Sequence, residues 1–436
     1  MTSKLITNIA LSFITILASS ILPLNNAVAL DKASNNLQNS YPIAQTTTNS
    51  ISTEQIKQVA KNQNATLVQY SLLADNSQES ELAIWVIKPT GDTMRRVDLK
   101  AWKQKSKTSL AELITKTNSK LNSGNYFNKG GISIGKSPQN KPISIELKKL
   151  HQVLIQPIAN LLPKQPEERV IFIPQNKLFL VPFAALQDNK GKYLIEKHTI
   201  STAPSIQVLD LLHQRKIRRN NQKSFVPTTM TDDELLIVGN PTAPKVSLTK
   251  GDSCKPPSLP GAEEEAKNIA QIFKTQPLIG DAATETAIVQ KMSQARIIHL
   301  ATMTYPEDCK TNNSPGVIAL ASSNQDDGWL RTSEIQNLNL KADLVVLSAC
   351  ETALGRITND GVIGLSRAFF TAGADSVIGS LWLVPDESTA TLMTEFHANL
   401  SKNTDKASAL RQAMLETMKQ YPNPRDWAGF TLVGLL

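Results

Sequence analysis

Cys350 stands where a reactive thiol is chemically well placed. It ends the apolar run 344–349 and precedes 351–355, a segment typical of a turn. A thiol at a strand tip lies near backbone N–H groups of the following turn, and these groups stabilise a thiolate. Free cysteine is also among the most buried residue types, and buried cysteine is usually inert. Residue type and position therefore leave two roles open, a nucleophile and a packing residue.

His299 lies in a second apolar run, 296–302, which also predicts a strand. Both runs are continuous rather than alternating, as is typical of strands buried on both faces of a parallel sheet. Sites in such sheets form at the carboxyl ends of the strands. We therefore expect chemistry after His299 and around Cys350.

The elements that must position these residues follow a regular pattern from about residue 146. Strands are predicted over 169–174, 178–186, 194–201, 235–239, 376–382 and 430–433, and helices over 147–162, 262–273, 361–372 and 386–420, with a further helix opened by Thr284. This alternation predicts an α/β fold with a mostly parallel sheet and helices on both faces. Before it, 65–70 and 82–87 predict a hairpin and 107–121 a helix, which gives a small α+β portion over 55–140.

A set of motifs surrounds Cys350 in a fixed order. They are Pro182–Leu186, Gly239–Pro241, Leu259–Ala262 with Glu264 and Ala266, Leu347–Thr352, Gly361–Phe369, Ser380–Trp382 and Trp427–Gly434. Together they resemble the CHAT domain, a family of the caspase and separase clan of cysteine peptidases, over residues 145–436. The resemblance implies a caspase-like α/β fold and a His–Cys dyad, with Cys350 at the position of the nucleophile.

The dyad departs from the family pattern at its base. In the family, the second histidine of a His-x-Ala-Thr-His-Gly motif is the base, and here Met303 and Thr304 replace that histidine and its glycine. A thioether cannot accept a proton from a thiol at neutral pH. His299 lies about 13 Å back along an extended strand, outside hydrogen-bond reach. We expect His299 to be a structural residue bonded within the sheet edge, with a role as alternative base open. His397, on a C-terminal helix, is the other histidine that could best approach Cys350.

Three functions remain in view. The first is a catalytically impaired protein that binds peptides or protein partners through its cleft, which Met303 favours. The second is an active cysteine endopeptidase that uses Cys350. The third is a structural envelope module in which Cys350 is buried packing. Whether the protein is an enzyme stays open at this point.

The first thirty residues predict export. Lys4, the apolar run 5–24 and Ala27–Ala29 form the pattern of a signal peptide over 1–29. The apolar length would also permit a retained membrane anchor, but Pro23 and the polar interruptions favour removal. Residues 30–54 are rich in Asn, Ser, Thr and Gln and predict a disordered linker. We expect a periplasmic or extracellular protein with no stable membrane span after signal removal.

Composition and charge limit the remaining possibilities. The chain has 436 residues, 41% hydrophobic and 19% charged, which is typical of a globular protein. Its net charge of +8 is spread along the chain, and the basic cluster 215–223 lacks interleaved aromatic residues. We interpret that cluster as a solvated loop rather than a nucleic-acid surface.

The three cysteines are the last feature of interest. Cys254 and Cys309 lie in polar segments, so their pairing is the simplest one and leaves Cys350 free, although spacing alone does not fix the connectivity. No His/Cys cluster has zinc spacing and no glycine loop fits a phosphate. Asp326 and Asp327 are more typical of a solvated turn than of a cation site. We therefore expect no metal and no cofactor. The resemblance to the CHAT domain implies a peptide or protein as partner.

Overall fold

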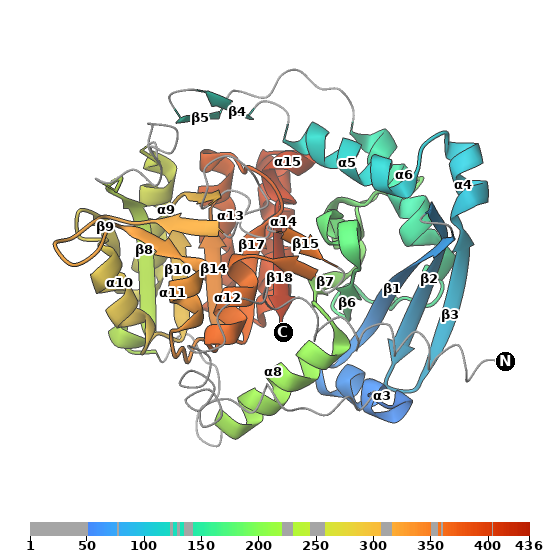
Figure 1. The fold of residues 1–436 in the computed structure, drawn as a ribbon, viewed down its shortest axis with the longest axis horizontal. Coiled ribbons are helices and arrows are strands. Elements are labelled where there is room, and N and C mark those ends of the chain that lie inside the picture. The colour runs from blue at the N-terminus through green and yellow to red at the C-terminus, as the bar shows by residue number, and fades with distance from the viewer. Residues whose placement is uncertain are drawn as a thin grey trace, which may run out of the picture. The chain divides into compact units, whose positions relative to one another are not determined.

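Eleven strands build the main sheet of the computed structural model (Figure 1). The structure describes residues 51–75, 78–122, 125–128, 131–134, 143–219, 230–244, 258–306, 316–349, 356–358, 361–402 and 404–436. In spatial order the strands are β3 (Gly91–Asp98), β2 (Gln78–Lys88), β1 (Ala65–Asp75), β6 (Arg169–Ile173), β7 (Thr199–Thr202), β18 (Phe430–Gly434), β17 (Ser376–Ser380), β14 (Leu344–Ser348), β10 (Ile297–Ala301), β8 (Leu235–Pro241) and β9 (Leu278–Gly280).

Parallel pairing dominates this sheet. Strands β17, β14, β10, β8 and β9 form one parallel block, and β1, β6, β7 and β18 form a second. The two blocks meet at the antiparallel pair of β17 and β18. The α/β fold with a mostly parallel sheet, predicted from the continuous apolar runs, is confirmed.

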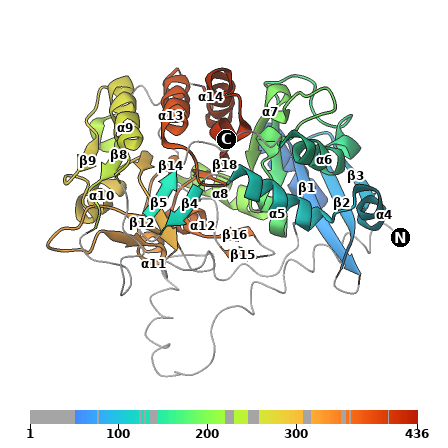
Figure 2. The same ribbon diagram turned by 90° about the horizontal axis from the view of Figure 1, so that it is seen from above.

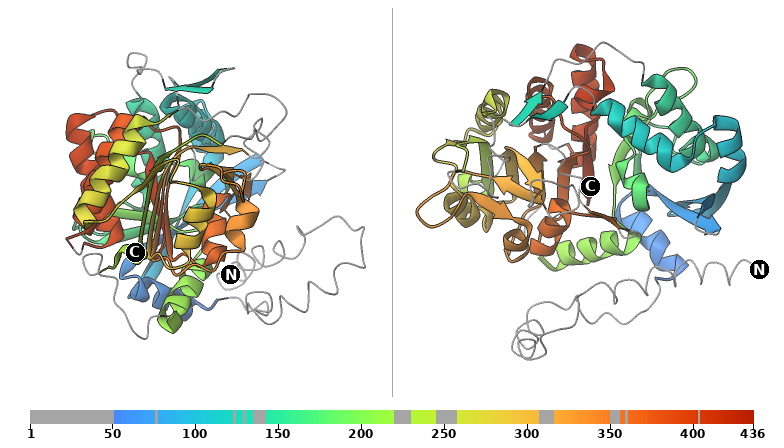
Figure 3. Two further views of the ribbon diagram at one scale, coloured as in Figure 1. Left: turned by 90° about the vertical axis from the view of Figure 1, so that its left-hand side faces the viewer. Right: turned by 45° about the horizontal axis from the view of Figure 1, so that its top comes forward.

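Helices cover both faces of the first block (Figures 2 and 3). On one face lie α9 (Pro260–Phe273), α13 (Asp386–Leu400) and α14 (Lys406–Gln420), and on the other lie α10 (Glu285–Met292), α11 (Thr332–Gln336) and α12 (Leu365–Ala372). Along β10, Ile297 belongs to the core cluster that includes residues of α9 and α13, whereas Ile298 and Leu300 belong to the cluster that includes residues of α10 and α12. Alternate residues of a strand point to opposite faces, so His299 faces α9 and α13.

The small N-terminal portion joins the same sheet. The predicted hairpin is present as β1 and β2, and β1 pairs in parallel with β6, from Ala65 with Arg169 to Gln69 with Ile173. Its helices are α4 (Leu99–Ser106) and α5 (Leu110–Leu121), followed by α6 (Ser144–Leu154). Residues 59–436 form one compact unit. Of the preceding unit only 51–58 are described, at the start of α3 (Thr53–Asn62), so the predicted signal peptide and most of the linker lie outside the described residues.

Shorter elements complete the described chain. They are β4 (Asn125–Asn128) with β5 (Gly131–Ile134), the sheet of β11 (Thr304–Pro306), β12 (Gly316–Ala319) and β13 (Trp329–Arg331), β15 (Arg356–Thr358) with β16 (Gly361–Ile363), α7 (Leu194–Lys197), α8 (Ile206–Arg219) and α15 (Pro424–Trp427). Among the helices of the described residues, none has both the length and the hydropathy needed to cross a bilayer.

Three local predictions were wrong. Residues 178–186, predicted as a strand, instead form the end of the 3-10 helix η3 (Asn176–Leu180) and the 3-10 helix η4 (Phe183–Ala185) with their flanking residues. Residues 194–201 divide into α7 and the start of β7. Pro182 has no N–H to donate in a sheet ladder. Its carbonyl accepts a turn hydrogen bond from Ala185 N at 2.9 Å. The basic residues 215–219, predicted as part of a loop, form the end of helix α8.

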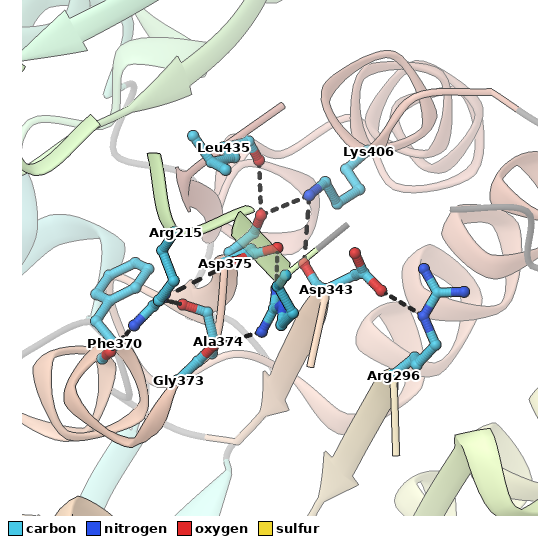
Figure 4. A network of polar contacts seen from close by, with 11 residues as sticks. Arg215, Arg296, Asp343, Phe370, Gly373, Ala374, Asp375, Lys406 and Leu435 are labelled. Atoms are coloured by element: carbon cyan, nitrogen blue, oxygen red, sulfur yellow. Dashed lines mark hydrogen bonds and ion pairs between the residues drawn. The ribbon is translucent and has the colours of Figure 1, made fainter. Parts of the chain in front are cut away.

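The basic end of α8 binds the end of α12 (Figure 4). Arg215 Nη1 donates to Phe370 O at 2.9 Å, and Arg219 Nη1 donates to Gly373 O at 3.1 Å. Arg219 also pairs with Asp375, which is fully buried. These two arginines satisfy carbonyls at a helix C-terminus, where positive charge is favoured.

Lys406 is the buried cation of the same network (Figure 4). Its side chain is 2% exposed, and Nζ donates to Ser376 Oγ at 2.6 Å and to Asp343 O at 3.3 Å. These contacts tie α14 to the amino ends of β14 and β17. Burial, with a smaller contribution from Lys216, lowers the pKa of the Lys406 amine from 10.5 to about 7.

Substituting Lys406→Met should remove a pH dependence of stability. Between about pH 7 and 10.5 the unfolded state binds more protons at Lys406 than the folded state does, so this group makes stability rise with pH. Relative to Lys406→Met, the wild-type free energy of unfolding should rise by up to about 1.4 kcal/mol per pH unit. Urea unfolding at pH 7, 8 and 9 measures this. Lys419→Met, on the exposed side of α14, is the control. Because it keeps Lys406, its free energy of unfolding should change with pH as that of wild type does. An equal slope in wild type and Lys406→Met would contradict the prediction.

Candidate functional site

The tips of β10 and β14 meet at one edge of the sheet. The two strands pair in parallel from Ile297 with Leu344 to Ala301 with Ser348. The residues that follow, Thr302 and Ala349, therefore leave the sheet side by side. The sequence predicted chemistry at these two strand ends, and the structure brings them together. Cys350 follows Ala349 directly but lies outside the described residues, as do Cys254 and Cys309.

Met303, which the sequence analysis predicts to stand in place of the family's histidine, is a packed core residue. Its side chain is 2% exposed. It belongs to a separate apolar cluster with Tyr305, Val317, Ala319, Trp329 and Leu383. Its carbonyl accepts from Ala319 N at 2.9 Å, which anchors the backbone to β12. The Met303 side chain is thus held mainly by apolar packing from the sheet of β11, β12 and β13.

His299 lies inside the fold and bonds to helices rather than within the sheet edge. It is 0% exposed, and its strand has β14 and β8 as neighbours. Nε2 lies 2.7 Å from Glu265 Oε1 on α9, and Nδ1 lies 3.1 Å from His397 Nε2 on α13. Both ring nitrogens are therefore engaged by buried side chains. The predicted edge location was wrong because β10 is an interior strand of the sheet, and its odd-numbered residues face α9 and α13.

Glu265 is the residue of this arrangement that the sequence analysis did not identify. Its neighbour Glu264, in the same acidic first turn of α9, is exposed, and the helix dipole favours acidic residues at such an end. Glu265 instead falls on the buried stripe of the helix with Ala262, Ala266 and Ile269. Glu265 lies three positions after Ala262, on the apolar face of the helix. An acidic residue on such a face is the sequence signal that could have identified it. Burial raises the pKa of the Glu265 carboxyl, and the hydrogen bond with His299 lowers it in part.

A small hollow opens between α9, α13 and the two strand tips. Its volume is about 20 Å³, enough for about one water molecule. The described residues that line it are Leu259, Ala262, Glu265, Thr302, Met303, Ser348, Ala349, Val384, Asp386 and Thr389. Two of these side chains are carboxyl groups, and Met303 supplies part of the apolar wall.

The segment before α13 forms one wall of the hollow and is fixed at several points. Leu381 N donates to Gly429 O at 2.7 Å, and Leu383 N donates to Asn122 Oδ1 at 3.0 Å. Asp386 accepts from Gly261 N at 2.7 Å. A Cβ on Gly261 would lie 2.5 Å from the Asp386 carboxyl, so this approach requires glycine. Burial raises the pKa of the Asp386 carboxyl, and hydrogen bonds from the backbone of Gly261 and Ala262 lower it in part.

A family model for the CHAT domain matches residues 144–435. The chain belongs to the CHAT domain family. Two curated relatives are tetratricopeptide repeat protein 28 of Mus musculus, 28% identical over 345 residues, and its Homo sapiens counterpart, 29% identical over 327 residues. The alignments cover 70% and 66% of this chain but only 14% and 13% of those relatives.

The fold also resembles that of a solved structure. Saccharomyces cerevisiae separase, in its complex with securin, matches 93% of this chain and 33% of its own, with a TM-score of 0.50 and 13% identity. At that identity the similarity concerns the fold alone. The caspase-like fold expected from the motifs is confirmed.

The carboxyl groups of the acidic turn at Asp326 and Asp327 form hydrogen bonds and an ion pair with nearby residues of the chain. Asp326 accepts from Thr286 N at 3.0 Å and from Ser323 Oγ at 2.6 Å, and Asp327 pairs with Arg331 at 2.7 Å. Within the described part of the chain, no group of three or more His, Cys, Asp or Glu side chains is arranged to hold a metal ion.

Substituting Met303→Ala should destabilise the CHAT domain markedly. Removing a fully buried methionine side chain costs about 2–5 kcal/mol, because the cavity left behind is only partly refilled. Met303→Leu, which conserves volume, should cost less than about 1.5 kcal/mol. Met94→Ala, at a partly buried position of β3, is the control. Chemical unfolding measures all three, and a cost for Met303→Ala as small as that of the control would show that Met303 faces an open cleft.

Proposed function

We propose that this CHAT-domain protein binds a peptide or protein segment at the tips of β10 and β14 without hydrolysing it. The observation that carries the proposal is the burial of Met303 at the position where the family has its base. A thioether packed in an apolar cluster neither accepts a proton from a thiol nor delivers one to a leaving amine.

His299 gives no ready substitute for that base. Both of its ring nitrogens already have buried partners, Glu265 and His397. An imidazole can activate a nucleophile only through a nitrogen within hydrogen-bond reach of it. The first of the three functions inferred from the sequence is thus favoured over an active peptidase.

A protein or peptide as partner is supported by the solved relative. Separase is seen in a complex with securin, so a protein that shares this fold binds a protein partner. By analogy, we infer the same class of partner for this chain, since carboxyl ends of parallel strands are where such folds bind ligands.

A comparison of activity variants tests this proposal. Wild type should leave a mixed peptide library intact, whereas Met303→His with Thr304→Gly should cleave it by restoring an imidazole and its glycine. The rate should exceed that of the matched pair Met303→Gln with Thr304→Gly by about 10²–10⁴-fold, the usual effect of general acid–base catalysis. Adding Cys350→Ala to the first pair should abolish cleavage.

The peptides cleaved by the restored variant then serve as binding probes. Wild type should retain the same peptides uncleaved, as measured by fluorescence anisotropy. Cleavage by wild type that is lost in Cys350→Ala would establish the peptidase alternative. Failure of wild type to bind any of these peptides, together with slow alkylation of Cys350 in the native protein, would establish the structural envelope module.

Export is a second part of the proposal and has its own test. If 1–29 is a signal peptide, the mature protein recovered outside the inner membrane should begin at Leu30. Substituting Ala29→Arg at the cleavage site should block processing and leave the full-length chain membrane-bound. Measuring the intact mass of the recovered protein distinguishes the processed chain from the full-length chain. A full-length wild-type protein would favour the retained anchor.

A further inference from the structure

The positive charge of the chain comes from one segment, so the interpretation that it is spread along the chain was wrong. Residues 99–154 contain eleven lysines, no arginine and two glutamates, which gives this segment a net charge of +9. The rest of the chain contains 35 basic and 36 acidic residues, a net charge of −1. The net charge of +8 therefore arises between α4 and α6.

Helix packing brings eight of the eleven lysines onto one surface. They lie in the described ranges 99–122 and 143–154, in and around α4, α5 and α6, which lie side by side (Figures 1 and 2). Lys149 Nζ on α6 donates to Ser106 O at the end of α4 at 3.2 Å, which joins these two helices. Apolar residues of all three helices belong to the main core cluster, so the polar sides of the helices face away from it. We call this outer side the lysine surface, and its members are Lys100, Lys103, Lys105, Lys107, Lys116, Lys120, Lys148 and Lys149.

The two glutamates of the segment compensate only a small part of this charge. Glu146 is 3% exposed and pairs with Lys116 at 3.2 Å and with Lys120 at 2.8 Å, which joins α5 to α6. Glu112 caps the start of α5, where its carboxylate accepts from Ser109 N at 2.8 Å. Both carboxylates thus have local structural roles, and the lysine surface keeps a strong positive charge.

Helix α4 carries the densest part of the lysine surface. Lys100, Lys103, Lys105 and Lys107 are all exposed, within eight residues of the sequence. The helix dipole favours cations in the last turn of α4, but it disfavours Lys100 in the first turn. Like charges three or four positions apart also repel one another. An approaching anionic surface would relieve this repulsion.

The residue types on the lysine surface indicate a lipid layer rather than a nucleic acid. Arginine is the residue that forms paired hydrogen bonds with phosphate groups at defined positions, and 99–154 has none. Lysine is a point charge on a flexible stem, which suits a dense layer of anionic headgroups. Trp102, the one aromatic residue of 99–122 and 143–154, packs against the main core cluster and so is not presented for stacking on bases.

Ile145 adds an apolar side chain to the same surface. It is 57% exposed and is one of three large hydrophobic side chains exposed in the described part of the chain. Lys148 and Lys149 follow three and four positions later, so they lie on the same side of α6. At a bilayer interface, an apolar group can enter the boundary of the acyl chains while neighbouring ammonium groups stay among the headgroups.

We propose that the lysine surface binds this protein to membranes that contain anionic phospholipids. Charge complementarity supplies the attraction, and this attraction falls off within a Debye length of the membrane. The contact is reversible, because it depends on charge and one apolar side chain rather than on a spanning helix. This proposal does not depend on peptide binding at the tips of β10 and β14.

Vesicle sedimentation tests the proposal. The mature chain from Leu30 is used, because it retains the compact unit 59–436 and lacks the apolar run 5–24, which would itself bind lipid. Wild type should bind vesicles of equal parts phosphatidylglycerol and phosphatidylcholine, and should not bind vesicles of phosphatidylcholine alone. Lys103→Gln with Lys105→Gln should lower the partition coefficient by about 25-fold, since each lysine near an anionic surface contributes about fivefold. Raising NaCl from about 0.1 M to about 1 M should release wild type, because the Debye length falls from about 10 Å to about 3 Å.

A matched pair outside the lysine surface is the control. Lys291→Gln with Lys341→Gln removes the same charge from two exposed positions beyond 99–154 and should leave the partition coefficient within about twofold of wild type. Circular dichroism checks the fold of each variant, and Lys100→Gln with Lys107→Gln serves if the first pair is misfolded. Equal losses in the test and control pairs, or no binding of wild type to anionic vesicles, would overturn the proposal. Tighter binding to duplex DNA than to the vesicles at the same salt would overturn it in favour of a nucleic acid.

Discussion

The parallel pairing of β10 with β14 is the constraint on which the candidate site depends. Its register joins Ala301 to Ser348, and β8 and β17 occupy the outer edges of the pair. A slip of one residue would turn every buried side chain of a strand to the opposite face, so the register is held by both core clusters. The chain must therefore leave both strands at the same level and the same edge. This geometry places Thr302 and Met303 beside Ser348 and Ala349 in the lining of the hollow.

The same alternation separates polar chemistry from apolar packing. His299 points from the middle of β10 toward two helices, where a carboxylate and a second imidazole satisfy it. Met303, beyond the end of the strand, enters the apolar cluster around Trp329. A buried imidazole requires hydrogen-bond partners, whereas a thioether requires only close packing. The fold thus holds a buried polar chain in the middle of β10 and a packed methionine just beyond its end.

The N-terminal portion is structurally part of the site. Strand β1 extends the sheet beside β6, and the end of α5 supplies Asn122 to the backbone of Leu383. Leu383 also packs in the cluster that holds Met303, and the next residue, Val384, lines the hollow. A segment that precedes the matched family region therefore fixes one wall of the candidate site.

The sequence by itself determined the fold class and the strand ends that carry the candidate site, and it predicted the loss of the family's histidine at Met303. Continuous apolar runs and ordered motifs are local signals, and local signals suffice for these conclusions. The tertiary structure alone decided that Glu265, His299 and His397 meet, since they are separated by 34 and 98 positions along the chain and only helix packing joins them. It likewise decided that Met303 is buried and that β1 to β3 extend the sheet, because burial and strand pairing depend on what the rest of the chain places alongside.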